Sequence, residues 1–570
     1  MEHRKIQGIH FIRVKGDIKD RLNAHIRLLK EETRTGAIPA LIKKNEGLIR
    51  RGPGLLQSKL VQDLVISFYR KVLLPYMGNR LDAQVVEAMK SSGDIAGFTF
   101  EQTREALFQA DAMMILARTA IMRYLLPEWI AQEGLPGCTS AVVQGEWTKN
   151  KTLLSCRNLD YPVVGPWERH PCVVFNEPTE KGEIPHYTLT TAGVHFPGVT
   201  AMNLEGITLF AHAHFGRKVS LQGNPVVMIG DEVIRKAKNL DQAIDIVRKN
   251  LPFTNWSFVV TSARDKQAIV IESTPRVAKV RGSEEGFLAH TNYFHDPELQ
   301  KEEALISGGY REDLEGRFCR IAELLRPLKG QLMPSHMTSA LGDHMDYFSR
   351  TERVFANTLS VTTTVQSAVF EPENLKFWMS NRLESPVGLG TFLEVDVEKF
   401  WKTPVENYDS TFKAIPGYQP KNPRLIPAVR EFRRAYQSFH MNNQEPDYQE
   451  KALQHLQEAS AILPEDEHLA MQVGLLAFKM NQFDIAYRAL ESTLKGNMTL
   501  HSNAVRDLFL GRCLDLQGKR EEAILLYEKN CSNHEPKLAS AFKKGMRQPY
   551  RAFETKSIAV DFHFPDAFEY

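Results

Sequence analysis

One cysteine lies where the chain changes its local pattern, and its surroundings indicate covalent chemistry. Cys138 lies in Leu135-Pro-Gly-Cys-Thr-Ser-Ala141, after a Pro-Gly break and at the head of a β-like stretch. If the Gly137–Cys138 bond were cut, Cys138 would carry a thiol nucleophile and an α-amine that titrates near neutral pH and can act as a base. The alternative is a small buried hydrophobic side chain in a strand.

Length and composition limit the classes of protein that can surround this cysteine. A chain of 570 residues can form several domains, and its 71 basic and 69 acidic residues nearly cancel. We therefore expect no general affinity for nucleic acid or an anionic membrane. Six cysteines form no metal-ligand spacing and suggest no disulfide framework, which favours a reducing, cytoplasmic location. The longest apolar run, residues 112–130, contains Arg118 and Arg123, so we expect no membrane span.

The hydrophobic period divides the chain into regions that differ in character. Residues 1–137 have mainly helical periodicity, whereas residues 138–403 contain many short β-rich runs interrupted by two helical patterns. This order predicts an α+β core with a largely antiparallel sheet system. A Pro-containing linker is expected at 404–430, followed by helical repeats at 431–535 and a C-terminal tail at 536–570.

The helical repeats are indicated by three related segments. Ala452 and Ala486 occupy matching places 34 residues apart, and Ala523 follows after a further 37 residues. The first spacing is the period of a tetratricopeptide repeat. Gly474 and Gly511 each lie 12 residues before the next alanine. We expect degenerate tetratricopeptide-like repeats that dock a protein partner, a second copy or the catalytic core; a generic helical-hairpin cap is the alternative.

Short motifs in a fixed order connect this cysteine to a known superfamily. The motifs are Gly137-Cys-Thr-Ser, Cys156-Arg-Asn-Leu-Asp160, Met202-Asn-Leu-Glu-Gly206, His290-Thr-Asn-Tyr-Phe294 and Thr364-Val-Gln-Ser-Ala-Val-Phe-Glu-Pro372. Together they resemble the N-terminal-nucleophile (Ntn) hydrolases, and within them the acyl-CoA:6-aminopenicillanic acid acyltransferases. Penicillin V acylases and bile-salt hydrolases are more distant members. The resemblance covers roughly residues 80 to 400.

This resemblance implies a four-layer αββα sandwich with the nucleophile at the start of a central strand. It also implies self-cleavage at Gly137–Cys138, by thiol attack on the Gly137 carbonyl and an N-to-S acyl shift. Gly93-Asp-Ile-Ala-Gly97 and the following Thr99-Phe-Glu-Gln resemble the region before the cleavage site in these acyltransferases. The segment 1–137 is therefore predicted to remain bound as a small subunit.

Three further residues match catalytic positions of the superfamily. Arg157 would stabilise negative charge or lower the thiol pKa, and Asp160 would hold the new α-ammonium or orient the thiol. The alternative for this pair is a structural ion pair at a strand end. Asn292 matches an oxyanion-hole asparagine, with a turn asparagine as its alternative.

Two other positions are open. The second oxyanion asparagine of bile-salt hydrolases has no match in Phe210-Ala-His-Ala-His-Phe215, so the donor is either His214 or the backbone. Arg317 matches an arginine that follows the Asn292 loop, and a helix-surface arginine is the alternative. The histidines form no metal-ligand pattern, and we expect neither a metal nor an organic cofactor.

The sequence therefore predicts a self-processing cysteine hydrolase or acyltransferase that acts on a small acyl amide or thioester. The motifs do not distinguish water from an amine as acyl acceptor. One rival is an inactive Ntn-like scaffold that binds a partner through its repeats. The other is an unprocessed cysteine amidase that uses a histidine such as His290 as base.

Overall fold

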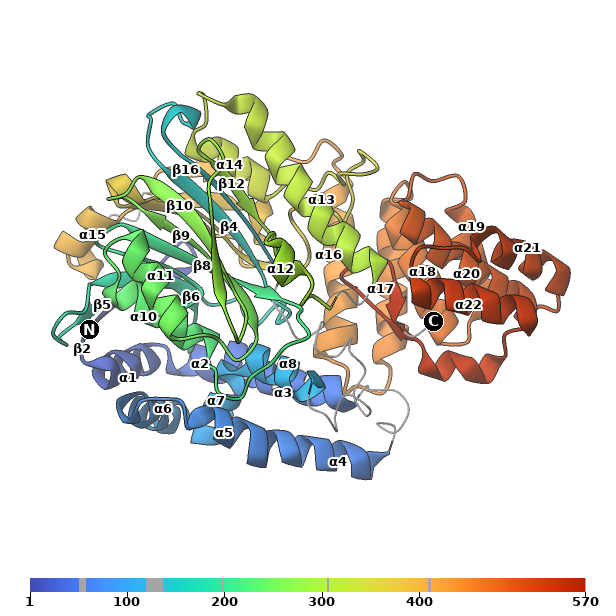
Figure 1. The fold of residues 1–570 in the computed structure, drawn as a ribbon, viewed down its shortest axis with the longest axis horizontal. Coiled ribbons are helices and arrows are strands. Elements are labelled where there is room, and N and C mark those ends of the chain that lie inside the picture. Colours follow the sequence, from blue (N-terminus) through green and yellow to red (C-terminus); the bar gives the residue numbers. More distant parts are fainter. Residues whose placement is uncertain (51–57, 119–136, 197, 305–306, 409–411, 569–570) are drawn as a thin grey trace.

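The computed structural model covers the whole chain and describes all residues except 51–57, 119–136, 197, 305–306, 409–411 and 569–570. Most of the apolar run at 112–130, including Arg123, and the Leu135-Pro136 pair lie outside the described residues. The described part is α+β: two large sheets form its middle region, and helices form its C-terminal region (Figure 1).

The larger sheet has nine strands and joins the N-terminus to the middle of the chain. All its neighbouring strands are antiparallel, except for β2 and β5, which are parallel. Its strands, in spatial order, are β1 (Glu2–Ile6), β2 (Ile9–Gly16), β5 (Pro171–Pro178), β6 (His186–Thr191), β7 (Thr200–Asn203), β8 (Ile207–His214), β9 (Asn255–Ser262), β10 (Gln267–Ser273) and β11 (Ala278–Gly282).

The smaller sheet has seven strands, is fully antiparallel and carries Cys138. Its strands, in spatial order, are β12 (Phe287–His290), β3 (Gly137–Val143), β4 (Leu154–Asp160), β13 (Thr364–Glu371), β14 (Lys376–Ser380), β15 (Thr391–Asp396) and β16 (Ala414–Pro416). The antiparallel system predicted from the short β-rich runs is therefore present.

The two sheets pack face to face through aromatic side chains. Tyr187 of the larger sheet stacks on Phe377 of the smaller sheet, with ring centroids 4.9 Å apart. Phe210 and Phe370 approach in the same way at 5.3 Å. Stacked and tilted pairs at such distances add to the apolar area that they bury. These contacts place β6 opposite β14 and β8 opposite β13, and β8 also lies against β3.

Helices cover the other face of each sheet. On the larger sheet, Leu209 and Val260 pack with α10 (Val226–Lys236) and α11 (Leu240–Lys249). On the smaller sheet, Ala141 packs under α13 (Gly308–Leu325) and α14 (Pro334–Leu341). Two short helices, α12 (Pro297–Gln300) and α15 (Val397–Lys402), complete the core.

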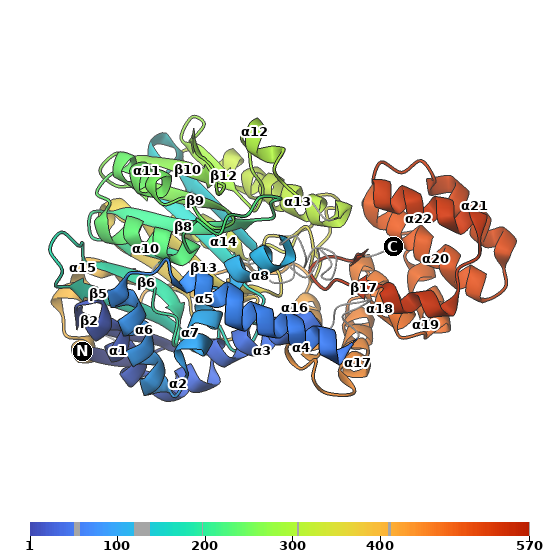
Figure 2. The same ribbon diagram turned by 60° about the horizontal axis from the view of Figure 1, so that its bottom comes forward.

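The N-terminal region, predicted to be mainly helical, begins with a β-hairpin. Residues 2–16 form the β1–β2 hairpin, because Gln7 and Gly8 both adopt positive φ angles in a two-residue turn. The remaining described part is helical and runs beneath the sheets (Figure 2). Its helices are α1 (Ile18–Leu28), α2 (Lys30–Thr35), α3 (Ala37–Arg50), α4 (Lys59–Phe68), α5 (Leu74–Gly78), α6 (Ala83–Ala96), α7 (Phe100–Leu107) and α8 (Gln109–Arg118).

The C-terminal region is a run of helices in which each contacts the next. It begins inside the expected linker, since β16 and the start of α16 both lie within 404–430. It also extends into the expected tail through α22 and the two-stranded pair β17 (Ala559–Val560) and β18 (Ala567–Phe568). The helices are α16 (Leu425–Tyr436), α17 (Tyr448–Ile462), α18 (Glu467–Lys479), α19 (Phe483–Ser492), α20 (Leu500–Leu516), α21 (Arg520–Asn530) and α22 (Pro536–Arg547).

A loop between α14 and β13 joins the core to these helices. Arg353 in this loop binds Asp466, the N-cap of α18, and Phe355 stacks on Phe432 of α16 at 4.2 Å. The core and the C-terminal helices therefore share one apolar contact region. Within the described residues, no helix has both the length and the apolar character needed to cross a bilayer.

Candidate active site

Cys138 is the second residue of β3, at the end of the strand where the chain enters the smaller sheet. The antiparallel pairing with β4 places Gly137 opposite Asp160 and Ser140 opposite Arg157. A Cβ atom on residue 137 would lie only 3.3–3.4 Å from the Asp160 side chain, so glycine fits this close approach. Two residues predicted from one short motif are thus brought next to the nucleophile by a single strand pair.

Three different side chains bind the three reactive groups of Cys138. Asn292 accepts a hydrogen bond from the backbone nitrogen of Cys138 through its Oδ1 atom at 2.7 Å. Arg317 donates from Nη1 to the Cys138 carbonyl oxygen at 2.8 Å, and Arg157 Nη2 lies 3.1 Å from the thiol sulfur. The residue is fully buried. The arrangement fixes the nitrogen that would become the α-amine as well as the thiol.

Arg157 keeps unused donors beside the thiol. Its Nη2 also donates to the Ala211 carbonyl at 2.8 Å, but Nε and Nη1 are buried without a hydrogen-bond partner in the described part of the chain. Among the described residues, no carboxylate forms a salt bridge with Arg157. Burial lowers the pKa of its guanidinium. A buried N–H group without a hydrogen-bond partner costs free energy, so a substrate oxygen is a natural partner for these two nitrogens.

Asp160 lies between Gly137 and Arg317. Its carboxylate accepts a hydrogen bond from the Thr364 hydroxyl at 2.7 Å and lies 3.8 Å from Arg317 Nη1. Burial raises the pKa of Asp160, while the charge of Arg317 opposes that rise. The carboxylate is therefore placed to face an ammonium group formed at residue 138.

Arg317 is a buried site residue and not a helix-surface arginine. It projects from α13 and is fixed by Asp313, one turn earlier, through an Nε–Oδ2 contact of 2.9 Å. Sequence reasoning missed Asp313 and Thr364. The i, i+4 spacing of Asp313 and Arg317 on one helix could have revealed the first. Thr364 opens the motif Thr364–Pro372, but no role was predicted for it.

Asn292 does not present its amide N–H to Cys138 in this structure. Its Nδ2 donates to the Ala213 carbonyl at 2.9 Å, and its Oδ1 faces Cys138 and Arg317. In the intact chain the side chain therefore positions the Cys138 nitrogen. An oxyanion-donating role for Asn292 remains a prediction.

The thiol is neutral in the intact chain at pH 7. Burial raises the pKa of Cys138 to about 11, although Arg157 and Arg317 favour the thiolate and Asp160 disfavours it. No histidine or carboxylate of the described residues is found hydrogen-bonded to the sulfur. A thiol in this state needs a base close at hand before it can react at neutral pH.

His214 is not found in contact with Cys138. Its ring stacks on Phe294 at 4.2 Å and lies near His290, which is in turn close to His212 and His295. This buried cluster also contacts the nucleophile strand, since His212 Nε2 is 2.8 Å from the Ser140 hydroxyl. Burial lowers the pKa of His290 well below its usual value, so the ring is neutral at pH 7.

Among the described residues, one group of side chains converges as metal ligands could, and it lies in the C-terminal helices. Glu431, His455 and Glu458 approach one another on α16 and α17, where they are partly or fully exposed. The four clustered histidines do not form such a group among the described residues.

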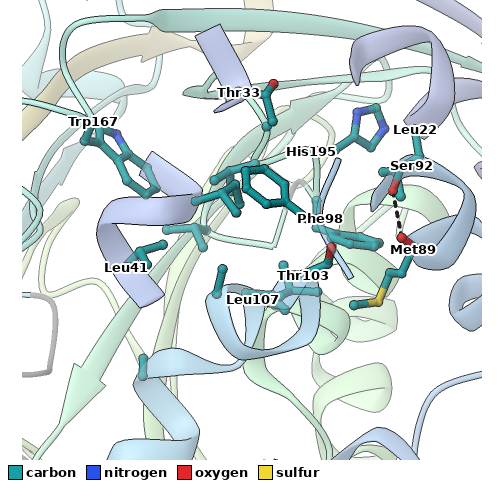
Figure 3. A pocket seen from close by; sticks show the side chains of 18 of the residues that line it. Leu22, Thr33, Leu41, Met89, Ser92, Phe98, Thr103, Leu107, Trp167 and His195 are labelled. Carbon is teal, nitrogen blue, oxygen red and sulfur yellow. Dashed lines mark hydrogen bonds between the residues drawn. The ribbon is translucent and has the colours of Figure 1, made fainter. Parts of the chain in front are cut away.

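An apolar cavity begins beside the thiol. Leu159 and Trp167 pack against Cys138 and also line the cavity, and Ala211, whose carbonyl is 3.6 Å from the sulfur, forms another part of its wall. The free space is about 1040 Å³, including its open part. Figure 3 shows Phe98, Leu107 and Leu41 around the space with Trp167 at one side.

Most of this wall comes from the N-terminal region, namely α1, α3, α6 and α7. No sequence pattern indicates that role, because the residues lie far from Cys138 in the chain and follow ordinary helical periodicity. They include Leu22, Ile26, Ile38, Leu41, Met89, Ala96, Ala106 and Leu107.

Comparison with protein families gives one match. Residues 147–383 match the family described as acyl-coenzyme A:6-aminopenicillanic acid acyl-transferase. The matched segment begins after Cys138 but contains Arg157, Asp160, Asn292 and Arg317. No curated protein matches the chain. Residues 147–383, less than half of the chain, are thus similar to this acyltransferase family.

Proposed function

We propose that this protein is a self-processing Ntn-type cysteine hydrolase or acyltransferase that acts on acyl amides or thioesters. One observation carries the proposal. The backbone nitrogen, the carbonyl oxygen and the sulfur of Cys138 are each bound by a different side chain, and Gly137 precedes it without a Cβ atom. Such an arrangement suits cleavage before Cys138 and the use of the new terminus as a base.

Self-processing starts from the neutral thiol. The sulfur attacks the Gly137 carbonyl carbon, the C–N bond to Cys138 breaks, and the acyl group moves to sulfur while the nitrogen gains a proton. Water then cleaves the thioester and leaves a Gly137 carboxylate and a free Cys138 α-amine. Asp160, next to Gly137, stabilises that amine when it is protonated.

Turnover uses the same groups. The α-amine takes the thiol proton, and the sulfur attacks the acyl carbonyl of the substrate to form an acyl-cysteine. Arg157 donates to the developing oxyanion from Nε or Nη1. Asn292 becomes a second oxyanion donor after the Cys138 nitrogen, which it binds in the intact chain, has become an amine. The α-ammonium returns its proton to the leaving group, and water or an amine then accepts the acyl group.

The acyl group of the substrate occupies the apolar cavity beside the sulfur. Its wall is mostly aliphatic and aromatic, and its size, including the part open to solvent, is near the upper end of the usual range for ligand sites. Since the N-terminal helices supply most of that wall, residues 1–137 remain bound after cleavage and act as the small subunit. The substrate class is therefore a carboxylic acid derivative with an aliphatic chain.

The same proposal extends to the architecture and the C-terminal region. The packing of two sheets between helices supports a four-layer αββα sandwich. Ala452, Ala486 and Ala523 are all fully buried, and a Cβ on Gly474 would collide with Leu490. Small residues at helix crossings support tetratricopeptide-like repeats that bind a protein partner. All six cysteines are unpaired, which supports a cytoplasmic location.

Trapping the acyl-cysteine tests this function. Purified protein is mixed with acyl thioesters of two to sixteen carbons, and intact mass is measured within seconds. We expect one acyl adduct on the fragment beginning at Cys138, with the rate rising about fourfold per methylene until the cavity is full.

Matched controls make the result specific. Cys138→Ala must form no adduct, whereas Cys156→Ala, a second buried cysteine on the neighbouring strand, must behave like wild type. Leu107→Trp, which narrows the cavity, must shorten the preferred chain. Adduct formation at another cysteine, or equal rates for all chains, would contradict the proposal.

A further inference from the structure

A second pocket lies on the other side of the Cys138 backbone. Gly137, Asp160 and Arg317 line it, and its free space is about 690 Å³ including the part open to solvent. Its far wall is not built by the catalytic core. Phe562 and Phe564 supply that wall, and both lie in residues 558–568, hereafter the C-terminal segment.

The C-terminal segment is fastened in place by specific contacts. Its two strands, β17 and β18, pair with each other, and Asp566 binds His501 of α20 at 2.8 Å. Phe564 and Asp566 pack directly on Gly309, where a Cβ atom would come within 3.0 Å of both side chains. Gly309 is the second residue of α13, the helix that carries Arg317. The segment is thus packed against the helix that positions the nucleophile.

The two cavities meet different groups of the nucleophile. The apolar cavity begins at Leu159 and Trp167, next to the sulfur, whereas the second pocket is lined by Gly137, on the nitrogen side. Once the Gly137–Cys138 bond is cut, the α-amine of Cys138 faces the second pocket. An acyl-cysteine therefore has its chain on one side and the attacking group on the other.

The chemistry of the second pocket differs from that of the first. Asp160 and Asp313 bring two carboxylates, Arg317 forms an ion pair with each of them, and His563 also lines the pocket. Phe355, Phe562 and Phe564 add aromatic rings. Acidic groups together with aromatic faces suit an amine that carries an apolar or aromatic group, and they disfavour an acyl chain or a second carboxylate.

We propose that this pocket binds the amine half of the reaction, and that the C-terminal segment selects it. The inference rests on the proposed function, since it needs an acyl-cysteine at residue 138. The amine nitrogen attacks the thioester carbonyl, the C–S bond breaks, and a C–N bond forms. The Cys138 α-amine takes the proton from the attacking nitrogen and returns it to the thiolate.

Partition of the acyl-enzyme between water and added amines tests this inference. The protein receives one fixed acyl thioester with increasing 2-phenylethylamine or ethylamine, and amide and free acid are quantified. We expect wild type to prefer 2-phenylethylamine by about tenfold or more, as burial of an aromatic side chain implies. Phe564→Ala should lose about tenfold in that preference, more than it loses in the acylation rate of Cys138.

Two further variants keep the test decisive. Phe553→Ala removes the same side chain from an exposed position near the C-terminal segment and must leave the preference intact. Val361→Trp fills the pocket from the core side without altering the segment, and it must reduce use of the larger amine most. If both pocket variants partition like Phe553→Ala, the inference is wrong.

The two proposals fail in different ways. If wild type forms no acyl adduct on Cys138, the proposed function itself is wrong, whatever the amine. If the adduct forms but neither amine competes with water, or if the pocket variants change the preferred acyl chain instead of the amine, only the role of the C-terminal segment is overturned.

Discussion

Two buried arginines in this molecule have opposite surroundings. Arg353, at the junction between the core and the C-terminal helices, binds Asp346, Asp466 and Glu467 at 2.9, 3.2 and 2.7 Å, and its side chain is fully buried. Arg157, beside the nucleophile, has no carboxylate bound to it among the described residues and leaves two donor nitrogens unpaired.

This difference separates a structural group from a reactive one. At the junction all three guanidinium nitrogens are hydrogen-bonded, so Arg353 has no unpaired nitrogen to offer a ligand. At the site the protein keeps a buried cation whose pKa is lowered by burial, which costs stability and is retained only where the charge is used. The comparison predicts that the two arginines affect stability and activity in opposite ways.

The largest effect on stability is expected at the junction. Arg353→Met leaves buried carboxylates without their cation and should lower the free energy of unfolding by about 3–5 kcal/mol. The activity per folded molecule should stay within about twofold of wild type, because Arg353 is remote from Cys138 and distant sites act nearly independently. Denaturant unfolding and active-site titration measure both.

A control comes from the same region. Arg434→Met on α16 breaks an exposed i, i+3 contact with Glu431 and should cost less than about 0.5 kcal/mol. If Arg353→Met were equally mild, the junction would not depend on this charge cluster.

At the active site the order of effects should reverse. Arg157→Met removes the oxyanion donor and should reduce kcat by about 100- to 1000-fold. It should leave the free energy of unfolding unchanged or raised, because it removes a buried charge that has no carboxylate partner. Steady-state kinetics and thermal unfolding of self-processed protein test this pair of outcomes. A variant that is destabilised but fully active would invert our assignment of the two arginines.

A smaller effect concerns pH and the C-terminal segment. Burial opposes the charged form of His501, but Asp566 and Glu535 outweigh it and raise its pKa to about 10. Because the folded pKa lies above the unfolded one, this stability is complete below about pH 6.5 and is lost as pH rises toward 10. Wild type should therefore lose about 2 kcal/mol or more between pH 7 and 10 from this group.

The variant comparison isolates that contribution. His501→Gln should show a flatter dependence of unfolding free energy on pH, whereas His534→Gln, at an exposed position, should follow wild type. Parallel curves for wild type and His501→Gln would show that His501 does not hold the segment by charge.

The sequence predicted what depends on short spans. Cys138, Arg157 and Asp160 lie on two consecutive antiparallel strands, so one local pairing brings them together. The β1–β2 hairpin was missed although its Gln7-Gly8 turn is a local signal; the flanking residues were assigned to a helical region as a whole.

What could not be predicted depends on contacts between distant segments. The parallel pairing of β2 with β5 joins residues some 160 positions apart and leaves no periodic mark. Asn292 and Arg317, like Arg157 and Asp160, were identified by resemblance. His214, one of two alternatives for the second oxyanion donor, is not found in contact with Cys138 among the described residues. The C-terminal segment was expected to be a tail, and nothing in its composition predicts that Phe564 and Asp566 pack against Gly309.

The most direct test of the whole account is the intact mass, under denaturing conditions, of wild type beside Cys138→Ala. We predict two polypeptides for wild type, the larger beginning at Cys138, and a single full-length chain for the variant. If folded wild type also remains full length, the α-amine base does not exist and the Ntn mechanism is contradicted.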